Sequence, residues 1–296
     1  MRIAVIGASG QVGTEVVVAA RAAGCEVVPI VHAQCEVTSP SSVQGALRAL
    51  GAGDAVVNTA AFHRTDECED QPERAMAVNA MGAYNVAKAA RERGAAVVFL
   101  STDFVFDGAK ADPYVESDVP QPLNAYGVSK LAGEMLTEHA IQAHYIARIS
   151  SVFGAAGSSG KGGNFVETMI GKARRGETIE VVDDIVMAPT YAADAARLLV
   201  ALLVKRAPFG VYHIANAGEC SWNAFANAIL EDAGLTARAT AVSSSRIPVK
   251  ARRPPHSTLA SERLGTLDLH ARFWRDGLDA YLVEKGHRVG ASAARG

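Results

Sequence analysis

Short apolar runs alternate with longer amphipathic stretches along the first half of the chain. The runs are rich in β-branched residues and lack the polar alternation of a half-exposed strand, which predicts strands buried on both faces. The predicted strands are residues 2–6, 26–31, 54–58, 95–100 and 145–150. Between them, apolar residues recur at helical spacing, which predicts helices at residues 11–23, 39–50, 71–93 and 125–139.

Turn-forming residues support these helix boundaries. Ser39 precedes Pro40, the pairing of an N-cap with a proline in the first turn, and Pro72 stands likewise at the start of the next helix. Gly24 and Gly94 stand just past two helix ends, where glycine accepts a left-handed conformation without strain.

The second half of the chain has a less regular pattern. It predicts helices at residues 164–175, 192–205 and 221–233 and a strand at 210–214. Glycine and serine in 155–163 predict a mobile surface loop, the prolines of 246–257 predict an irregular segment, and residues 287–296 predict a disordered tail. Alternating strands and helices with short connections predict an α/β fold with a doubly wound parallel sheet of Rossmann type.

Composition narrows the range of partners. The 296 residues are 49% hydrophobic with a formal net charge of −2, so a large core can form and no concentrated positive field serves nucleic acid or an anionic membrane. The four cysteines form no CxxC pair and no histidine cluster has metal-ligand spacing, so we expect reduced thiols and no metal. No run has the features of a signal peptide or a membrane span, which favours a cytoplasmic protein.

A glycine-rich turn joins the first predicted strand to the first predicted helix. Gly7, Gly10 and Gly13 have the spacing GxxGxxG, which lets backbone approach a pyrophosphate at a helix N-terminus. This position predicts a dinucleotide-binding domain formed by residues 1–154 and 190–215. Residues 155–189 and 216–286 are then expected to form a smaller α/β substrate-binding lobe.

The end of the second predicted strand bears on the choice of dinucleotide. A carboxylate at this place binds the ribose 2′-hydroxyl of NAD, whereas a cationic group accommodates the 2′-phosphate of NADP. The strand ends Val31-His32-Ala33 without an acid. We therefore expect NADP, with NAD as the alternative, although His32 also fits the description of an ordinary surface histidine.

Tyr126 and Lys130 form a YxxxK motif on the predicted helix 125–139. Residues four apart share a helix face, so the Lys130 ammonium is expected to lower the pKa of the Tyr126 hydroxyl and make it a general acid. Thr102 ends the strand before this helix, where ligands sit in open α/β sheets, and its hydroxyl can polarise the same carbonyl oxygen. Each motif alone also fits an ordinary surface pair or turn, but their order along the chain predicts hydride transfer at a carbonyl carbon.

These motifs resemble the extended short-chain dehydrogenase/reductases, and within them the dTDP-4-dehydrorhamnose reductase family. The resemblance covers nearly the whole chain. The matching stretches are residues 7–13 (GASGQVG), 58–61 (NTAA), 66–79, 101–108 (STDFVFDG), 124–134 (NAYGVSKLAGE), 164–166, 181–184, 189–191, 210–213, 221–222 and 251–254 (ARRP).

The resemblance implies roles for individual residues. Thr102, Tyr126 and Lys130 would be catalytic. The nicotinamide cofactor would be lined by Gly7, Gly10, Gln11, Val12, Gly13, His32, Glu36, Val37, Ala60 and Ala61, with Glu36 where the family usually has aspartate. The nucleotide-sugar substrate would be met by Asp103, Phe104, Ser151, Arg252 and Arg253. The guanidinium of an arginine suits a diphosphate because its donors form a fork. Arg252 and Arg253 fit a pair of solvated surface charges equally well. A homodimer through the helix at 71–93 is a further implication.

Two departures from the family pattern fall on the sugar side. Phe104 replaces a tyrosine and loses a hydroxyl, and Ser151 replaces a tryptophan. The loss of a designed hydrogen bond changes selectivity by orders of magnitude, so the sugar is less certain than the reaction.

Three functions follow from these features. The first is NAD(P)H-dependent reduction of a keto group on a nucleotide-linked deoxysugar, with Tyr126 as the proton donor. The second is a non-catalytic regulatory subunit that binds nucleotide, which the intact Thr102, Tyr126 and Lys130 argue against. The third is a sugar-nucleotide epimerase or dehydratase. Dehydratases tend to have an acid two places after the threonine, where this chain has Phe104.

Overall fold

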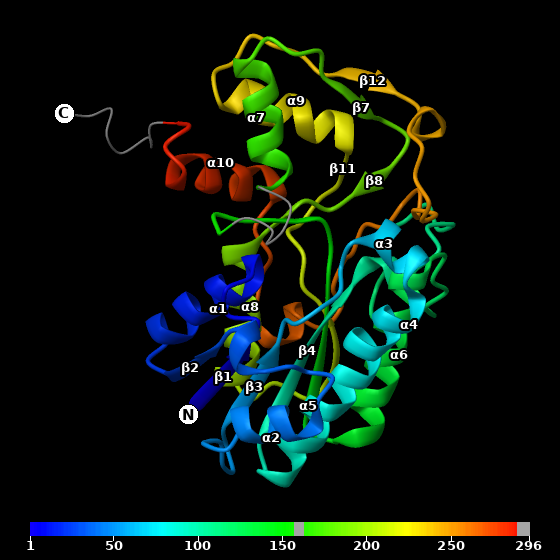
Figure 1. The fold of residues 1–296 in the computed structure, drawn as a ribbon. Helices are drawn as coiled ribbons and strands as arrows, with labels where there is room; N and C mark the ends of the chain where they lie inside the picture. The colour runs from blue at the N-terminus through cyan, green and yellow to red at the C-terminus, as the bar shows by residue number, and fades with distance from the viewer. Residues whose placement is uncertain (157–162, 289–296) are drawn as a thin grey trace, which may run out of the picture.

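Six parallel strands form the main sheet of the computed structural model, which describes residues 1–156 and 163–288. Their order across the sheet is β10-β5-β4-β3-β1-β2. The bounds are β1 (Arg2–Ile6), β2 (Glu26–Ile30), β3 (Ala55–Asn58), β4 (Ala96–Thr102), β5 (His144–Ile149) and β10 (Gly210–His213). This arrangement confirms the predicted α/β fold with a Rossmann-type parallel sheet (Figure 1).

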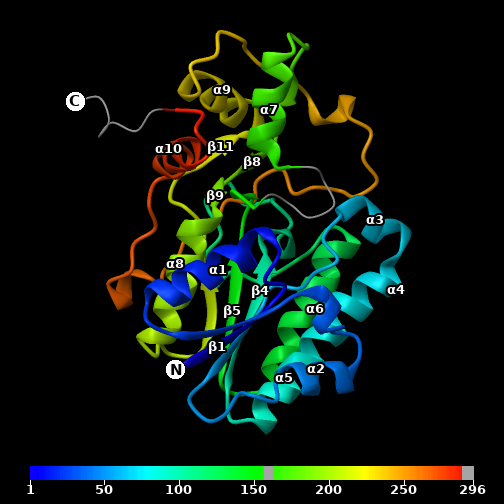
Figure 2. The same ribbon diagram turned by 60° about the vertical axis from the view of Figure 1, so that its left-hand side comes forward.

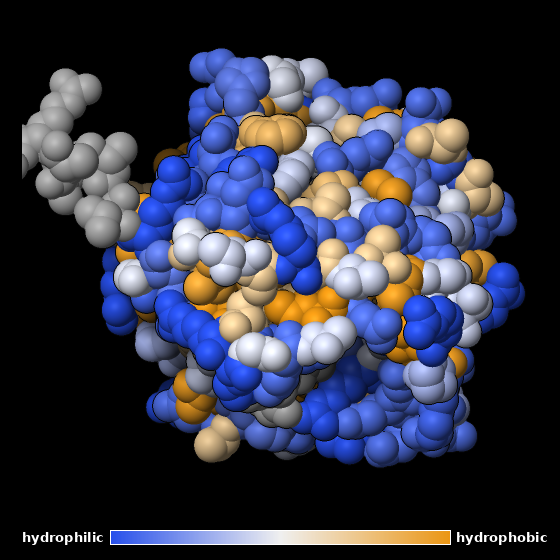
Figure 3. Space-filling model, turned by 90° about the horizontal axis from the view of Figure 1, so that it is seen from above, coloured by the Kyte–Doolittle hydropathy of each residue, from blue (hydrophilic) through white to orange (hydrophobic). Residues whose placement is uncertain are grey.

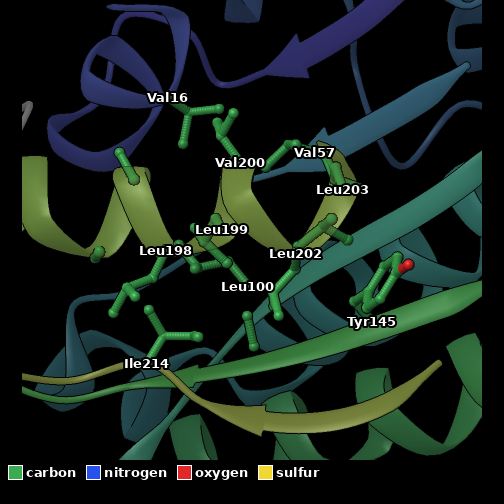
Figure 4. Packing of buried hydrophobic residues seen from close by; sticks show 14 of the residues in the cluster. Val16, Val57, Leu100, Tyr145, Leu198, Leu199, Val200, Leu202, Leu203 and Ile214 are labelled. Carbon is green, nitrogen blue, oxygen red and sulfur yellow. The ribbon is translucent and has the colours of Figure 1, made fainter. Parts of the chain in front are cut away.

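Helices cover both faces of the sheet. Helices α1 (Gln11–Ala22) and α8 (Ala192–Val204) lie on one face, and α2 (Pro40–Ala46), α5 (Gly82–Glu92) and α6 (Ala125–Ala140) lie on the other (Figures 1 and 2). Leucines of α8 pack against Val16 of α1 and against Val57 and Leu100 of the sheet (Figure 4). This burial on both faces explains why the strands read as continuous apolar runs.

The strand order reverses at β1, which pairs with β2 on one side and β3 on the other. The connection after β1 leads to β2 on one side, and the connection after β2 leads to β3 on the other side of β1. The carboxyl ends of β1 and β3 therefore border a crevice between the two connections. Ligands of doubly wound sheets bind at such a switch point.

The later part of the chain forms a second core above the carboxyl ends of the strands (Figures 1 and 2). It contains α7 (Phe165–Arg174), α9 (Trp222–Asp232) and α10 (Trp274–Glu284). Three two-stranded sheets accompany them: β6 (Val152–Phe153) with β9 (Thr190–Tyr191), β7 (Glu180–Val182) with β12 (Thr240–Val242), and β8 (Val186–Met187) with β11 (Cys220–Ser221). The aromatic rings of Phe153, Phe225 and Tyr281 meet in this core at centroid distances of 5.5 Å.

The structure corrects several boundaries. The single helix expected at 71–93 is α4 (Pro72–Ala75), a π-helical segment η2 (Met76–Met81) and α5, preceded by a separate α3 (Thr65–Asp70). The helix expected at 39–50 ends at Ala46, although Ser39 caps it as predicted by accepting from Ser42 N. Helix α10 has no counterpart in the prediction because its apolar positions lie in a segment rich in charges.

The prediction for residues 155–163 falls mostly outside the described residues, as does that for residues 289–296. His287 is described, and its Nε2 lies 3.0 Å from Glu167 Oε1, so it is held in place rather than part of a tail. No helix among residues 1–156 and 163–288 is long and apolar enough to cross a membrane. Seen from above, the molecule presents a largely hydrophilic face with small hydrophobic patches (Figure 3).

Candidate active site

A cleft of about 1400 Å³ crosses the carboxyl ends of β1, β3, β4 and β5. It brings together most residues that the sequence singled out, although they come from distant parts of the chain. The predicted residues that line it are Gly7, Gly10, Gln11, Val12, His32, Glu36, Val37, Ala60, Ala61, Thr102, Asp103, Phe104, Tyr126, Lys130, Ser151 and Arg253. Gly13 and Arg252 are not among the lining residues.

The glycine turn closes the cleft beneath β1. Gly7 has a φ of +81°, and a Cβ there would lie 2.5 Å from Thr59 Oγ1. Gly13 does not line the cleft but allows the helix to pack closely against the turn. A Cβ at this position would lie 2.1 Å from the Gly7 carbonyl oxygen. The helix can therefore start close under the turn only with glycine at both places.

The start of α1 fits a pyrophosphate. Gly10 occupies the N-cap without a side-chain cap, and no acid stands in the first turn. Gly10, Gln11 and Val12 line the cleft, so the positive end of the helix dipole lies at its edge. Gln11 Nε2 donates to Val152 O at 2.8 Å, while its buried Oε1 has no partner among the described residues. The turn thus has the donors and the free acceptor that a dinucleotide needs.

The region after β2 carries both an acid and a histidine. His32 begins the short helix η1 (His32–Gln34), and its side chain is 88% exposed with Nε2 at 4.0 Å from Glu36 Oε2. Two hydrogen bonds from Thr38 lower the pKa of the Glu36 carboxyl. The strand end itself has no acid, but the Glu36 carboxylate follows a few residues later. It lies near His32, the residue predicted to adjoin the 2′-phosphate.

Thr102 and Asp103 lie at the carboxyl end of β4. The Thr102 hydroxyl donates to Asp103 Oδ1 at 3.0 Å, and Thr102 lines the same cleft as Tyr126. Ser150 and Ser257 donate to the other carboxylate oxygen of Asp103 at 2.9 and 2.6 Å. The Asp103 side chain is 3% exposed, so it turns inward to hold Thr102 rather than outward to a sugar. Burial raises its pKa while the three hydroxyls oppose that rise.

Tyr126 and Lys130 lie on one face of α6, as predicted. The expected lowering of the Tyr126 pKa is wrong. Desolvation by the surrounding protein disfavours the charged phenolate and therefore raises this pKa. Lys130 is itself 2% exposed, and burial lowers its pKa to about 7. Its Nζ donates to Leu100 O at 2.5 Å and stands 4.1 Å from the centre of the Phe99 ring. Because its pKa is raised, the Tyr126 hydroxyl is protonated at neutral pH.

The two sugar-side departures meet the site in different ways. The Phe104 ring packs edge-on against Tyr126, with centroids 6.0 Å apart at 74°. Ser151 lines the cleft with a φ of +42°, a strained conformation for a residue with a side chain. The first therefore supports the phenol, and the second leaves room where a larger residue would stand.

The two arginines separate. Arg253 lines the cleft, and its Nη2 lies 3.8 Å from Asp66 Oδ2 of α3. The Arg252 side chain is exposed, while its carbonyl accepts from Asn124 Nδ2, the N-cap residue of α6, at 2.7 Å. Of these two arginines, Arg253 is the one that lines the cleft, and Arg252 anchors the segment through its backbone.

Two aromatic residues complete the cleft from above. Phe165 and Trp222 are the first residues of α7 and α9, and their rings meet edge-on at 4.7 Å. Neither was assigned a role from the sequence. The available signal was a shared pattern, since each follows a helix N-cap (Asn164 or Ser221) and so projects from the helix end nearest the site.

Comparisons with known proteins agree with this geometry. The family model described as RmlD substrate binding domain matches residues 1–286. The spore coat polysaccharide biosynthesis protein SpsK of Bacillus subtilis is 36% identical over 96% of this chain and 98% of its own length. The dTDP-4-dehydrorhamnose reductase of Mycolicibacterium smegmatis is 37% identical over 94% of this chain and 84% of its own length.

Solved structures show the same relationship. The Bacillus anthracis dTDP-4-dehydrorhamnose reductase in complex with NADP superposes with a TM-score of 0.90 at 32% identity, covering 96% of this chain and 99% of that one. The Thermus thermophilus UDP-glucose 4-epimerase in complex with NAD has a TM-score of 0.81 at 19% identity, covering 98% and 100% of the two chains, which shows a shared fold. The chain therefore belongs to the dTDP-4-dehydrorhamnose reductase family of NAD(P)-dependent oxidoreductases.

Proposed function

We propose that this protein reduces a keto group on a nucleotide-activated deoxysugar with NADPH. The observation that carries the proposal is that Thr102 and Tyr126 line one cleft at the end of β4 together with the glycine turn. Two hydroxyls at this place can hold one carbonyl oxygen. The cleft also extends to Arg253, whose guanidinium suits a sugar-linked diphosphate.

Each residue has a separate task in this reaction. Asp103 accepts the single hydroxyl proton of Thr102 and so holds this side chain at the end of β4; when substrate binds, that proton turns from Asp103 to the carbonyl oxygen. Tyr126 hydrogen-bonds to the same oxygen and gives up its proton as the alcohol forms, for which a protonated phenol is required. Lys130 supports the tyrosinate that remains and anchors the nicotinamide ribose. A bound NADPH would supply the hydride that the carbonyl carbon takes up.

A turnover assay tests the proposal directly. NADPH oxidation is followed at 340 nm with dTDP-4-dehydro-6-deoxysugars as substrates, and a regulatory subunit would bind NADPH without oxidising it. An epimerase or dehydratase would convert the sugar without consuming added NADPH. Either of these results, over a panel of 4-keto sugar nucleotides, contradicts the proposed reduction.

The preference for NADP is part of the proposal and depends on His32. An exposed imidazole directly after β2 tolerates a 2′-phosphate, whereas a carboxylate at that place would repel it and accept from a 2′-hydroxyl. The Glu36 carboxylate comes later in the chain and accepts two hydrogen bonds from Thr38. We expect His32→Asp to shift the ratio of kcat/KM for NADPH over NADH roughly tenfold toward NADH. The matched variant His32→Asn should shift the ratio less. An unchanged ratio in His32→Asp would remove His32 from cofactor selection.

The sugar side gives a second prediction. Phe104→Tyr combined with Ser151→Trp restores the hydroxyl and the indole of the family pattern in the cleft. We expect kcat/KM for dTDP-4-dehydrorhamnose to rise roughly tenfold relative to the other sugars of the panel. The KM for NADPH is the internal control and should not move. Equal selectivity in parent and variant would mean that these positions do not select the sugar.

The domain assignment is also a proposal: residues 1–154 and 190–215 bind the cofactor, and residues 155–189 and 216–286 form the substrate lobe. The separate core around α7, α9 and α10 supports it. The homodimer and the cytoplasmic location stay predictions, and sedimentation of the purified chain measures the first.

A further inference from the structure

Three charged side chains are buried together behind the catalytic end of β4. Lys130, Glu134 and Arg148 are 2%, 3% and 4% exposed. Burying charges is costly unless they are paired, so a cluster of this kind calls for an explanation. Arg148 and Glu134 form a bidentate ion pair, with Nε at 3.0 Å from Oε1 and Nη2 at 2.7 Å from Oε2.

Glu134 is joined to both elements that carry the reaction. It stands one helical turn beyond Lys130 on α6, and two turns beyond Tyr126, so the three share a helix face. Its Oε1 also accepts from Ser101 Oγ on β4. Ser101 lies between Leu100, whose carbonyl accepts from Lys130 Nζ, and Thr102. The carboxylate therefore ties the helix of the phenol to the strand of the threonine.

Arg148 is held from the other side by His213. Arg148 Nη1 lies 3.4 Å from His213 Nε2, and His213 Nδ1 lies 2.9 Å from the Ala260 carbonyl. The carbonyl requires a proton on Nδ1, so Nε2 is the acceptor and the ring is neutral. Burial lowers the pKa of His213 in agreement with this tautomer. Among residues 1–156 and 163–288, Arg148 is thus the cation that pairs with Glu134.

The other charged groups around Lys130 are few. Tyr126 lies on its own helix, and Asp103 follows β4. The charged residues of α3, α4 and α5, which also pack near α6, are half-buried or exposed, and η2 contributes the neutral Asn79. Glu134, one helical turn from Lys130, is the carboxylate that raises the pKa of the lysine against the effect of burial, and in a poorly screened interior such an interaction is strong.

Building on the proposed function, we propose that Glu134 is a positioning residue that keeps the Lys130 side chain charged and directed at the end of β4, and that Arg148 sets how strongly it does so. A carboxylate near Lys130 favours the ammonium, and the arginine bound to that carboxylate reduces its effect. Glu134 touches neither reacting atom and acts through Lys130. The pair thereby adjusts the pH range in which the reductase works.

Opposite shifts from the two partners of one ion pair test the proposal. Glu134→Gln removes the negative charge, and Arg148→Met leaves that charge unbalanced. We expect the basic limb of kcat/KM against pH to move down by about one pH unit in Glu134→Gln and up in Arg148→Met. The double variant Glu134→Gln with Arg148→Met removes both charges of the pair. Its basic limb should still lie at a lower pH than that of the parent, but the shift should be smaller than in Glu134→Gln alone.

A direct titration separates this inference from the proposed reaction. The ¹³Cε resonance of Lys130, identified by its loss in Lys130→Met, reports the lysine charge in the protein without substrate. The same two opposite shifts are expected there. If they appear while no 4-keto sugar nucleotide is reduced, the inference stands and the proposed function fails. Unmoved resonances in an active enzyme would reject the inference alone.

A matched control accounts for loss of stability. Asp194 is a buried carboxylate on α8, paired with Arg272 at 2.9 Å on the opposite face of the sheet. Asp194→Asn should lower the melting temperature and leave the basic limb in place. Shifts of equal sign in Glu134→Gln and Arg148→Met, or an equal shift in Asp194→Asn, would show that the pair is merely structural.

Discussion

Replacement of Tyr126 by phenylalanine should lower the rate of sugar-dependent NADPH oxidation about a thousandfold. The variant keeps the ring that packs against Phe104 and loses only the hydroxyl of a residue that lines the cleft. The alkoxide formed by hydride transfer then has no positioned proton donor. The measurement is the initial rate under saturating NADPH and sugar nucleotide.

Binding and folding serve as controls for this variant. NADPH affinity, measured by cofactor fluorescence, and the melting temperature should both stay near the parent values. A matched variant is Tyr84→Phe on α5, which removes a phenol outside the cleft and should keep full activity. A Tyr126→Phe enzyme that turned over as fast as the parent would disprove the mechanism.

Lys130→Met should make the protein more stable and much less active. Burial lowers the pKa of Lys130 from 10.5 to about 7, so folding carries the cost of desolvating this ammonium. Methionine fills similar space without that cost, which should raise the free energy of unfolding at pH 7 by a few kcal/mol and the melting temperature by about 5 °C. Activity should fall at least about a hundredfold because the tyrosinate loses its supporting cation.

The sign of the pH dependence follows from proton binding. Between pH 7 and 10.5 the unfolded chain holds a proton on this lysine that the folded chain has released. Stability of the parent therefore rises with pH across this window. The gain in Lys130→Met should be full below about pH 7 and should disappear as the pH approaches 10.5.

A surface lysine provides the comparison. Lys250 pairs with Asp70 at 2.6 Å with its side chain 62% exposed, so Lys250→Met should change stability by less than about 1 kcal/mol at any pH. Denaturant unfolding of parent and both variants from pH 6 to 10 measures these differences. A Lys130→Met protein that is less stable than its parent at pH 7 would show that the ammonium stabilises the fold.

Stability and activity are therefore opposed at one residue. In the proposed mechanism, the site keeps a lysine whose desolvation weakens the fold because the tyrosinate needs a supporting cation. Such a conflict is expected where a side chain is retained for function rather than packing.

Local patterns determined much of this protein. Apolar runs such as residues 2–6 and 95–100 predicted the strands, since a strand buried on both faces needs no alternation. Proline and capping residues placed the start of α2 at Pro40. The order of the glycine turn, Thr102 and the YxxxK motif predicted the catalytic end of the sheet, because parallel strands must present their carboxyl ends together.

Only the tertiary structure decided which groups those residues meet. Asp103 turns inward because Ser257, far along the chain, donates to its carboxylate, and Arg253 reaches the cleft while Arg252 does not. The pKa of Tyr126 is raised rather than lowered, since desolvation depends on every element around it and not on the spacing to Lys130. Spacing along one helix determines which side chains share a face. Burial and charge depend on contacts between distant segments, and those exist only once the chain has folded.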